Sequence, residues 1–372
     1  MLDLIELRHN LHKIPELAFK EFKTRALLEE SISKILQDQP KDTWKLHHFN
    51  GNTGLLLEYT CAAGPYLLFR ADMDALPIYE NTGVDYASEH PGFMHSCGHD
   101  IHLAILMGLI QFVAINKPQR NLLFLFQPAE EGEGGAQSVL AEGIIQKFNI
   151  EMVLALHIAS DLPVGAISAK EGIFFAIPQE FDVCFYGKSA HIAFPEKGID
   201  ALNAGIMFMN LITDRLQELK AKEKIIFHIG KMSSGTIRNV ISDQCVLEGT
   251  HRSLSKEISQ KINNVIKDTA AFVAKATGAN YEVKFLATYD PVINNANLVK
   301  RLQEICQREN IQYIPAETAM TGEDFGFFTT LYPGLLFWLG SGCPQPLHSD
   351  KFLPKDESIE VGVKVFSAFL PK

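Results

Sequence analysis

The residues best suited to chemistry gather in one short segment, MHSCGHDIH, at positions 94–102. This segment places Cys97 and His99 two residues apart, with His102 three residues further on. A thiolate and an imidazole this close, on a turn that contains glycine, can bind one metal ion, and zinc and its neighbours accept both ligand types. A buried cysteine beside a histidine that caps a helix would show the same spacing, so the segment alone leaves both interpretations open.

A second segment, QPAEEGEGG at positions 127–135, carries the adjacent glutamates Glu130 and Glu131 after Pro128. Adjacent side chains in extended backbone point to opposite sides. We therefore expect one carboxylate to bind metal and its neighbour to face the substrate as a general base. Paired glutamates also occur on solvated surfaces, which is the alternative for this motif taken alone.

Two further histidines lie near the ends of predicted strands. His157 ends the apolar run MVLALH, and His348 lies on a loop after the apolar residues 335–339. Either one alone is compatible with a hydrogen-bonded structural histidine. Two metal ions about 3.5–4 Å apart, sharing a bridging water, are a recognised hydrolytic arrangement. The candidate ligands together supply two sets of nitrogen, oxygen and sulfur donors: Cys97, His99, Glu131, His157 and His348.

The elements that must position these residues alternate between strands and helices in the first half of the chain. Short apolar runs at 66–69, 121–126 and 152–156 indicate an α/β domain with a mainly parallel sheet. Residues 101–115 are predicted as a buried helix with Asp100 as its N-terminal cap. In open α/β sheets, ligands bind outside the carboxyl ends of the strands. The ionisable residues that follow the three strands should therefore share one site: Arg70, Asp72, Asp74, Glu130, Glu131 and His157.

From about residue 174 the pattern changes to strand, helix, strand, strand, helix, strand. The predicted elements are 180–186, 200–219, 224–231, 244–252, 256–276 and 281–287. This β-α-β-β-α-β order is typical of a ferredoxin-like α+β domain. A helix at 296–308, a strand at 335–339 and a helix at 358–370 then return to the first domain. We expect one domain of residues 1–173 and 288–372 and an inserted domain of residues 174–287, since 372 residues exceed what a single core of roughly 250–300 residues accommodates.

Charge and composition narrow the class of partner. The 34 basic and 44 acidic residues give a net charge of −10, which argues against a nucleic-acid surface or an anionic membrane and favours small-molecule ligands. Asp3, Glu6 and Arg8 interrupt the first apolar residues, and the longest apolar run, 103–110, is shorter than the roughly 18 residues of a membrane span. The six cysteines form no CxxC pair. We expect a cytoplasmic protein with reduced thiols and no membrane partner.

Signatures of other enzyme classes are incomplete. The GKS at 187–189 would need a glycine at position 182 to form a phosphate-binding loop, and that position is Asp182. No GxSxG occurs, so a serine hydrolase of the nucleophile-elbow type lacks its motif.

With these residues in view, the chain resembles the M20 metallopeptidase family, and within it the amidohydrolase branch that uses a cysteine ligand. The resemblance implies that the five donors named above bind two divalent metal ions, which could be Zn, Mn, Co or Ni. It also implies that Glu130 is the general base and later the general acid, and that Asp72 orients a ligating imidazole. A salt bridge with Arg70 is the structural alternative for Asp72. The motifs occur in family order across the chain: RHNLHKIPELAFKEFKT, RADMDALP, MHSCGHDIH, QPAEEGEGG, LPVGAISAKEGIFFA, GKSAHIAFP, MTGEDFG and LHSDKF.

The same resemblance assigns the inserted domain as a lid that forms a homodimer. His191 in GKSAH stands where the family has a lid histidine that reaches the scissile carbonyl from the neighbouring subunit. Arg252 is similar to the family arginine that holds the substrate carboxylate, with an exposed strand-end charge as the alternative. Asn239 is a further candidate for this pocket. The segment GIFFAIPQE and the residue His251 depart from the family pattern, and we expect these positions to affect substrate recognition.

The implied activity is metal-dependent hydrolysis that removes the acetyl group from an N-acetylated diamino dicarboxylic acid. Another N-acyl amino acid, such as a hippurate-like compound, or a dipeptide would use the same mechanism. A non-catalytic protein that binds amino acids or metal on this scaffold is the alternative from a different class. The presence of Glu130 together with all five ligands argues against it.

Overall fold

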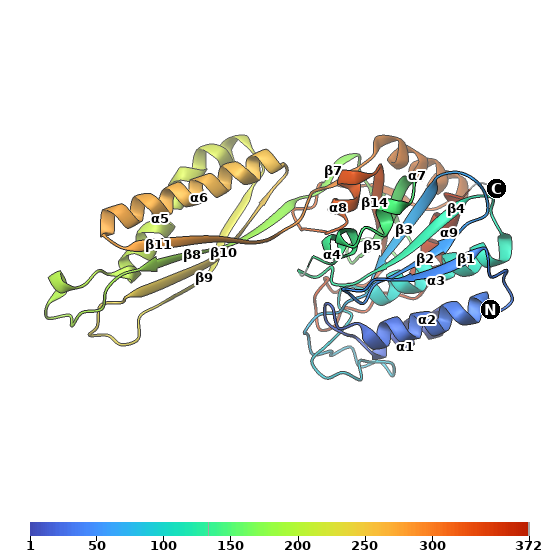
Figure 1. Ribbon diagram of the computed structural model, residues 1–372, viewed down its shortest axis with the longest axis horizontal. Helices are drawn as coiled ribbons and strands as arrows, with labels where there is room; N and C mark the ends of the chain where they lie inside the picture. Colours follow the sequence, from blue (N-terminus) through green and yellow to red (C-terminus); the bar gives the residue numbers. More distant parts are fainter. Residues whose placement is uncertain (133, 371–372) are drawn as a thin grey trace. The chain divides into compact units, whose positions relative to one another are not determined.

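The computed structural model describes residues 1–132 and 134–370, and it divides the chain into two compact units. Unit 1 contains Met1–Phe174, Val292–Thr318 and the chain from Asp324 onward, and unit 2 contains Phe175–Pro291 and Ala319–Glu323. Figure 1 shows a large sheet with helices in unit 1 and a separate sheet with two long helices in unit 2. The predicted fold class, a mainly parallel α/β domain with an inserted ferredoxin-like α+β domain, is confirmed.

Unit 1 is built on a ten-stranded sheet whose central strands are parallel. β3 pairs in parallel with β4 and β5, and β5 pairs in parallel with β14. Their carboxyl ends therefore lie at one edge, as the sequence predicts for a shared site. The order along the sheet is β1 (Trp44–His48), β2 (Leu55–Tyr59), β4 (Asn121–Gln127), β3 (Tyr66–Asp72), β5 (Ile150–Ala159), β14 (Gly334–Gly340), β12 (Val292–Asn294) and β7 (Gly172–Phe175); β6 (Ile167–Ala169) pairs with β14, and β13 (Tyr313–Pro315) pairs with β6.

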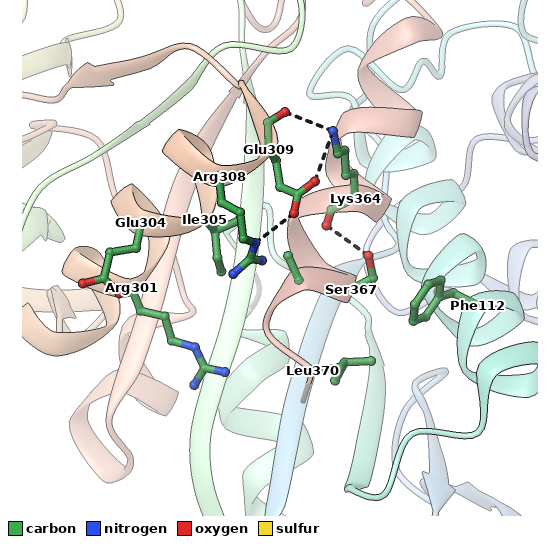
Figure 2. A pocket seen from close by; sticks show the side chains of 10 residues that line it. Phe112, Arg301, Glu304, Ile305, Arg308, Glu309, Lys364, Ser367 and Leu370 are labelled. Carbon is green, nitrogen blue, oxygen red and sulfur yellow. Dashed lines mark hydrogen bonds and ion pairs between the residues drawn. The ribbon is translucent and has the colours of Figure 1, made fainter. Parts of the chain in front are cut away.

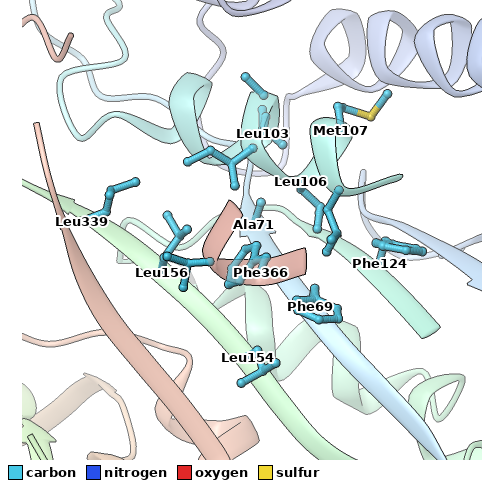
Figure 3. Close-up of a cluster of buried hydrophobic side chains, with 14 of the residues drawn as sticks. Phe69, Ala71, Leu103, Leu106, Met107, Phe124, Leu154, Leu156, Leu339 and Phe366 are labelled. Atoms are coloured by element: carbon cyan, nitrogen blue, oxygen red, sulfur yellow. The ribbon is translucent and has the colours of Figure 1, made fainter. Parts of the chain in front are cut away.

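The helices of unit 1 bury one another and the sheet in a single apolar core. Figure 3 shows Phe69 of β3 and Phe124 of β4 facing Leu103, Leu106 and Met107 of α3. The spacing 103, 106 and 107 places these three side chains on one face of a helix. The helices are α1 (Leu4–Lys13), α2 (Phe22–Leu36), α3 (His99–Asn116), α4 (Gly135–Ala141), α7 (Ala296–Glu309), α8 (Gly326–Leu331) and α9 (Glu357–Ala368), with a 3₁₀ turn at Ile145–Lys147.

Helix α3 is apolar on almost every side because it is a core helix. Among the described residues it is the one helix long and apolar enough to cross a membrane, with a mean hydropathy of 1.4, and 78% of that stretch is buried inside the molecule. A helix that is hydrophobic all round and packed on a sheet needs no bilayer.

The amino end of α3 corrects one prediction. Asp100 is not the cap; it lies inside the helix, and its side chain bonds to Arg8 and His12 instead. The cap position is Gly98, in the left-handed conformation with φ of 80°. A side chain at Gly98 would also lie 2.5 Å from Ile158, so the turn requires glycine for both reasons.

Unit 2 has the ferredoxin-like arrangement. Its four antiparallel strands follow the order β11 (Asn280–Thr288), β8 (Ile177–Tyr186), β10 (Gln244–Ser253), β9 (Ile226–Ser234). Helices α5 (Ala201–Lys222) and α6 (Lys256–Thr277) pack on one face, where Phe181, Phe185 and Leu247 are fully or almost fully buried. A 3₁₀ turn at Pro195–Lys197 precedes α5.

Candidate active site

The carboxyl edge of the parallel sheet brings together donor atoms of all five predicted metal ligands. Donor atoms of Cys97, His99 and His157 all lie within 4.8 Å of one another. The same limit holds for Cys97, Glu131 and His348, so Cys97 belongs to both groups. Cys97 precedes α3 and His99 begins it, His157 lies in β5, and the other two lie on loops after β4 and β14. Residues about 250 positions apart in sequence therefore meet because four parallel strands end together.

Two histidines of this cluster are oriented by backbone carbonyls, which leaves Nε2 as the ring nitrogen that could bind a metal ion. The Nδ1–H of His99 donates to the backbone oxygen of Asp74 at 2.8 Å, and the Nδ1–H of His157 donates to the backbone oxygen of Ile158 at 2.8 Å. In the neutral form of each imidazole, Nε2 carries the lone pair, and the Nε2 of His157 lies 3.4 Å from the Cys97 sulfur. Backbone carbonyls that fix the tautomer of an imidazole in this way are typical partners of metal-binding histidines.

His102 is close to the cluster but is not available as a ligand. Its Nδ1–H donates to Asp72 at 2.6 Å, and its Nε2 accepts the N–H of Ile158 at 2.9 Å. Asp72 was expected to orient a ligating imidazole, whereas its hydrogen bond goes to His102, and its other oxygen lies 3.8 Å from His99 Nε2. The salt bridge to Arg70 is also present, at 2.6 Å.

The electrostatics of the cluster favour a bound cation. Burial lowers the pKa of His99, but the carboxylates of Asp72 and Asp74 outweigh it and raise the pKa to about 10. Burial, followed by Glu131 and Glu130, raises the pKa of the Cys97 thiol well above its usual value. Such a thiol ionises when a nearby metal ion compensates its charge. The chemistry of the donor set therefore fits divalent cations of the zinc type.

The loop that carries the two glutamates corrects a second prediction. Glu130 and Glu131 do not alternate along an extended strand, because Ala129 has φ of 55° and turns the backbone. Donor atoms of both glutamates instead lie within 4.8 Å of a nitrogen of His99. Asp74 holds this turn: its two oxygens accept the N–H groups of Glu130 at 3.0 Å and Glu131 at 2.9 Å. Asp74 was predicted near the site, but its structural role there was not.

His348 also has an unusual backbone. Its φ is 65°, its N–H donates to the Ser96 oxygen at 2.9 Å, and its Nε2 lies 3.4 Å from Glu131. A non-glycine residue in the left-handed region costs free energy and is often found at functional sites. Its side chain is 53% exposed, which makes it the most accessible of the five predicted ligands.

A buried ion cluster beneath α3 was missed by the sequence interpretation. Asp100, the residue after His99, accepts from Arg8 Nε at 2.8 Å and from His12 Nδ1 at 2.8 Å. Arg8 also donates to Tyr86 at 3.0 Å and Asp356 at 3.1 Å. Burial opposes ionisation of Asp100, but Arg8 and His12 outweigh it and hold its pKa well below the usual value. The spacing of Arg8 and His12, one helical turn apart, was the available signal.

The three predicted residues of unit 2 fall into two places. The N–H of Ile192 donates to the Asn239 oxygen at 3.1 Å, and His191 bridges Val240, so His191 and Asn239 lie together and are exposed. Arg252 is near the other end of β10, with its guanidinium bonded to Thr250 at 2.9 Å. Gln244 and Arg252 are eight residue steps apart along β10, so the two ends of this strand are about 25 Å apart.

His251, expected from the sequence to affect substrate recognition, lies in the core of unit 2. It is fully buried, with Nε2 at 2.8 Å from the Asn263 side chain of α6. Burial lowers its pKa, so the imidazole is a neutral part of the core.

A separate hollow of about 460 Å³ lies between α7 and α9 (Figure 2). Three of its charged groups are paired with one another, since Glu309 bonds to both Arg308 at 2.9 Å and Lys364 at 3.3 Å. Phe112 on its wall is 13 residues beyond His99 along α3, or about 20 Å from the donor cluster. None of the predicted site residues lines this hollow. Its lining residues are Phe112, Arg301, Glu304, Ile305, Arg308, Glu309, Lys364, Ser367, Ala368 and Leu370.

The fold and the donor cluster together are those of a hydrolase that uses metal ions to cleave amide bonds. The chain matches peptidase family M20/M25/M40 over residues 68–372 and belongs to this family. The family resemblance noted from the sequence motifs is thereby confirmed, and the protein is a metal-dependent amide hydrolase.

Relatives with assigned names are similar along the whole chain. The N-acetyldiaminopimelate deacetylase of Shouchella clausii is 38% identical, covering 100% of this chain and 98% of the relative. The enzyme of the same name from Bacillus subtilis is 35% identical, covering 99% of this chain and 97% of the relative. The solved structure of the Bacillus subtilis YXEP protein, described as a dinuclear metal-binding peptidase of the M20 family, is 29% identical, covers 98% of this chain and 96% of that one, and has a TM-score of 0.84.

Proposed function

We propose that this protein removes the acetyl group from N-acetyl-LL-2,6-diaminoheptanedioate, giving LL-diaminopimelate and acetate, as a cytoplasmic step of lysine biosynthesis. The observation that carries the hydrolytic part is the pair of imidazoles, His99 and His157, whose Nδ1–H groups are held by backbone carbonyls and which each place a ring nitrogen within 4.8 Å of the Cys97 sulfur. The full-length similarity to proteins named N-acetyldiaminopimelate deacetylase supports the choice of substrate.

Five side chains would hold two divalent cations in this proposal: Cys97, His99, Glu131, His157 and His348. When bound, the cations would lower the pKa of water toward neutrality and polarise the acetyl carbonyl as Lewis acids.

Glu130 is the proposed general base. It is almost fully buried, and a carboxylate oxygen lies within 4.8 Å of donor atoms of both His99 and Glu131. It would take the proton from the attacking water and return it to the departing amine, which gives the free amino acid and acetate. Asp72 would hold His102 in place by accepting its Nδ1–H, so that the His102 Nε2 accepts the N–H of Ile158 beside His157.

Three residues of unit 2 are proposed to act on the substrate, His191 on the carbonyl and Arg252, with Asn239 as a further candidate, in substrate binding. His191 would stabilise the developing oxyanion, and Arg252 would bind the substrate carboxylate. His191 and Arg252 lie near opposite ends of β10, which are about 25 Å apart, so a single site would receive the two side chains from two subunits of a homodimer. This separation favours a dimer in which unit 2 serves as the shared lid domain.

An amine-release assay tests the proposal directly. Purified protein reconstituted with Zn²⁺ or Mn²⁺ is offered N-acetyl-LL-diaminopimelate, N-acetyl-lysine, hippurate and a dipeptide, each with and without a chelator. The proposal expects chelator-sensitive turnover with the highest kcat/KM for acetyl-diaminopimelate. Preference for one of the other three compounds would keep the hydrolytic site and discard the pathway. Inactivity on all four would contradict the catalytic assignment and favour a binding protein.

A further inference from the structure

Glu21 is a buried acidic residue that the proposed chemistry does not use. It stands at the cap position of α2 and is 0% exposed, yet its carboxylate does not accept from the first turn of that helix. Glu16 performs this capping, since it accepts the N–H groups of Lys23 at 2.8 Å and Thr24 at 2.9 Å. The Glu21 carboxylate is thus directed elsewhere.

The Glu21 side chain faces the turn that precedes the two active-site glutamates. Its Oε1 accepts the N–H of Ala129 at 3.0 Å and that of Phe19 at 3.0 Å, and its Oε2 accepts the hydroxyl of Thr53. Ala129 is itself 0% exposed. Without Glu21, its N–H would be buried and unpaired, which is costly.

Glu21 and Asp74 together bind three consecutive N–H groups of this turn. Glu21 takes that of Ala129, and Asp74 takes those of Glu130 and Glu131. The turn needs such support because Ala129 has φ of 55°, a left-handed conformation that is unfavourable for alanine. Strained residues of this kind persist when their surroundings leave no alternative.

The far side of the same turn is closed by backbone packing. The N–H of Gly135 donates to the Ala129 oxygen at 2.9 Å. A Cβ atom at Gly135 would lie 1.6 Å from the Pro128 oxygen, so the backbones of Pro128 and Gly135 are in close contact. Both backbone groups of Ala129 are therefore fixed, its oxygen by Gly135 and its N–H by Glu21.

We propose that Glu21 is a positioning residue: by holding Ala129 in the left-handed conformation, it sets the direction in which Glu130 and Glu131 present their carboxylates. This inference rests on the proposed roles of those two residues as general base and metal ligand. Glu21 lies at the amino end of α2, which is distant in sequence from every proposed ligand.

A neutral acceptor should serve this role as well as a carboxylate. The Oε1 of glutamine can accept the same two N–H groups, and its Nε2–H can donate to the Thr53 hydroxyl oxygen, whose proton is free to rotate. Glu21→Gln is therefore the conservative variant, and Glu21→Ala removes the contact.

Asn121 provides a matched control at the opposite end of β4. It is 3% exposed, and it holds a turn by accepting the N–H groups of Cys61 at 3.0 Å and Ala62 at 3.2 Å. Its side chain also donates to the Gly64 oxygen at 3.1 Å. Asn121→Ala therefore removes a comparable buried turn contact without touching the active-site loop.

The test compares the three variants by hydrogen exchange, Zn²⁺ titration and kinetics. In metal-free protein, Glu21→Ala should raise amide exchange at Ala129, Glu130 and Glu131 about tenfold or more. It should lower Zn²⁺ affinity and kcat by about 10- to 100-fold with little change in KM. Glu21→Gln should match the wild type in all three readouts. Asn121→Ala should lose stability and leave them unchanged.

Three results would overturn the inference. Glu21→Ala could lose stability but keep wild-type amide exchange, Zn²⁺ affinity and kcat, as expected for Asn121→Ala, or Glu21→Gln could lose as much Zn²⁺ affinity and kcat as Glu21→Ala. The third is a Glu21→Ala variant whose amide exchange changes everywhere except in this turn. If Glu21→Ala does not fold, Thr53→Val removes only the donor to Oε2. That variant should then show a smaller change in the same three amides, and wild-type exchange there would count against the inference. A wild type that binds Zn²⁺ but cleaves no acyl compound would defeat the proposed function alone, because exchange and titration would still report on Glu21.

Discussion

The two units of the molecule collect their chemically active side chains in different ways. In unit 1, the parallel strands β3, β4, β5 and β14 all end at one edge, so residues far apart in sequence meet there. In unit 2, neighbouring strands are antiparallel, and His191 and Arg252 lie at opposite ends of β10. A parallel sheet thus assembles a site within one chain, whereas in our proposal the residues of unit 2 act at one place only when a second copy is present.

Replacing the proposed general base should give the largest effect on activity. Glu130→Gln keeps the size and hydrogen bonding of the side chain but cannot take a proton, so kcat should fall on the order of 10²- to 10⁴-fold. Zn²⁺ affinity, measured by calorimetry, should stay within a few fold of the wild type. A near-normal kcat would show that Glu130 is not the base, and catalysis by the ligand cluster of unit 1 would then be unexplained.

A mixture of two inactive variants tests the role of unit 2. His191→Ala alone should lower kcat by about 10²- to 10³-fold. When it is mixed with Glu130→Gln and subunits exchange, half of the dimers are mixed and each contains one intact site, so activity should recover to about a quarter of the wild type. Recovery would not occur if His191 acted within its own chain, and the comparison between the units would then be wrong.

Removing one proposed ligand of unit 1 should weaken metal binding without unfolding the protein. Cys97→Ala should weaken Zn²⁺ binding by at least about 100-fold, as seen by competition with a coloured chelator. Cys306→Ala is the matched control, since that cysteine is also buried, at 1% exposure, but lies in α7. It should lose stability by creating a cavity and keep its metal affinity. Equal losses in both variants would argue that Cys97 is only a packed thiol.

The smallest expected effect is a pH dependence of stability at Glu21. Burial, opposed by Thr53 and reinforced by Asp74, raises its pKa from 4.5 to about 7. The folded state then holds the proton more tightly than the unfolded state, so Glu21 makes stability fall as pH rises from 4.5 to about 7, by roughly 3 kcal/mol. Glutamine does not titrate. The Tm of Glu21→Gln minus that of the wild type should therefore increase between pH 5 and pH 8, and a constant difference would contradict the raised pKa.

Some of the site could be predicted from the sequence because it depends on topology. Each apolar run that leads to Asp72, Glu130 or His157 can be recognised as a strand from its own sequence. Parallel pairing of these strands then brings their ends together. Local conformation was harder. Asp100 has the sequence position of a helix cap, but Arg8, 92 residues away, competes for its carboxylate. The turn at Ala129 depends likewise on Glu21 and Asp74, which no local pattern connects to it.

The division between the units shows the same limit. The motif MTGEDFG is continuous in sequence, yet Ala319–Glu323 belongs to unit 2 and Asp324 to unit 1. Ala319 accepts the N–H of Ala176 at 3.0 Å, while Asp324 accepts from Arg70 at 2.8 Å. Contacts between distant segments, which composition does not reveal, decide to which unit each half belongs.

Anomalous diffraction from crystals grown with Zn²⁺ is the most direct test of the central claim that one edge of unit 1 holds two metal ions. The account predicts two peaks at the zinc absorption edge, with Cys97, His99, Glu131, His157 and His348 as the protein ligands. A single peak, or peaks bound by Asp72 and His102 in place of these residues, would contradict it.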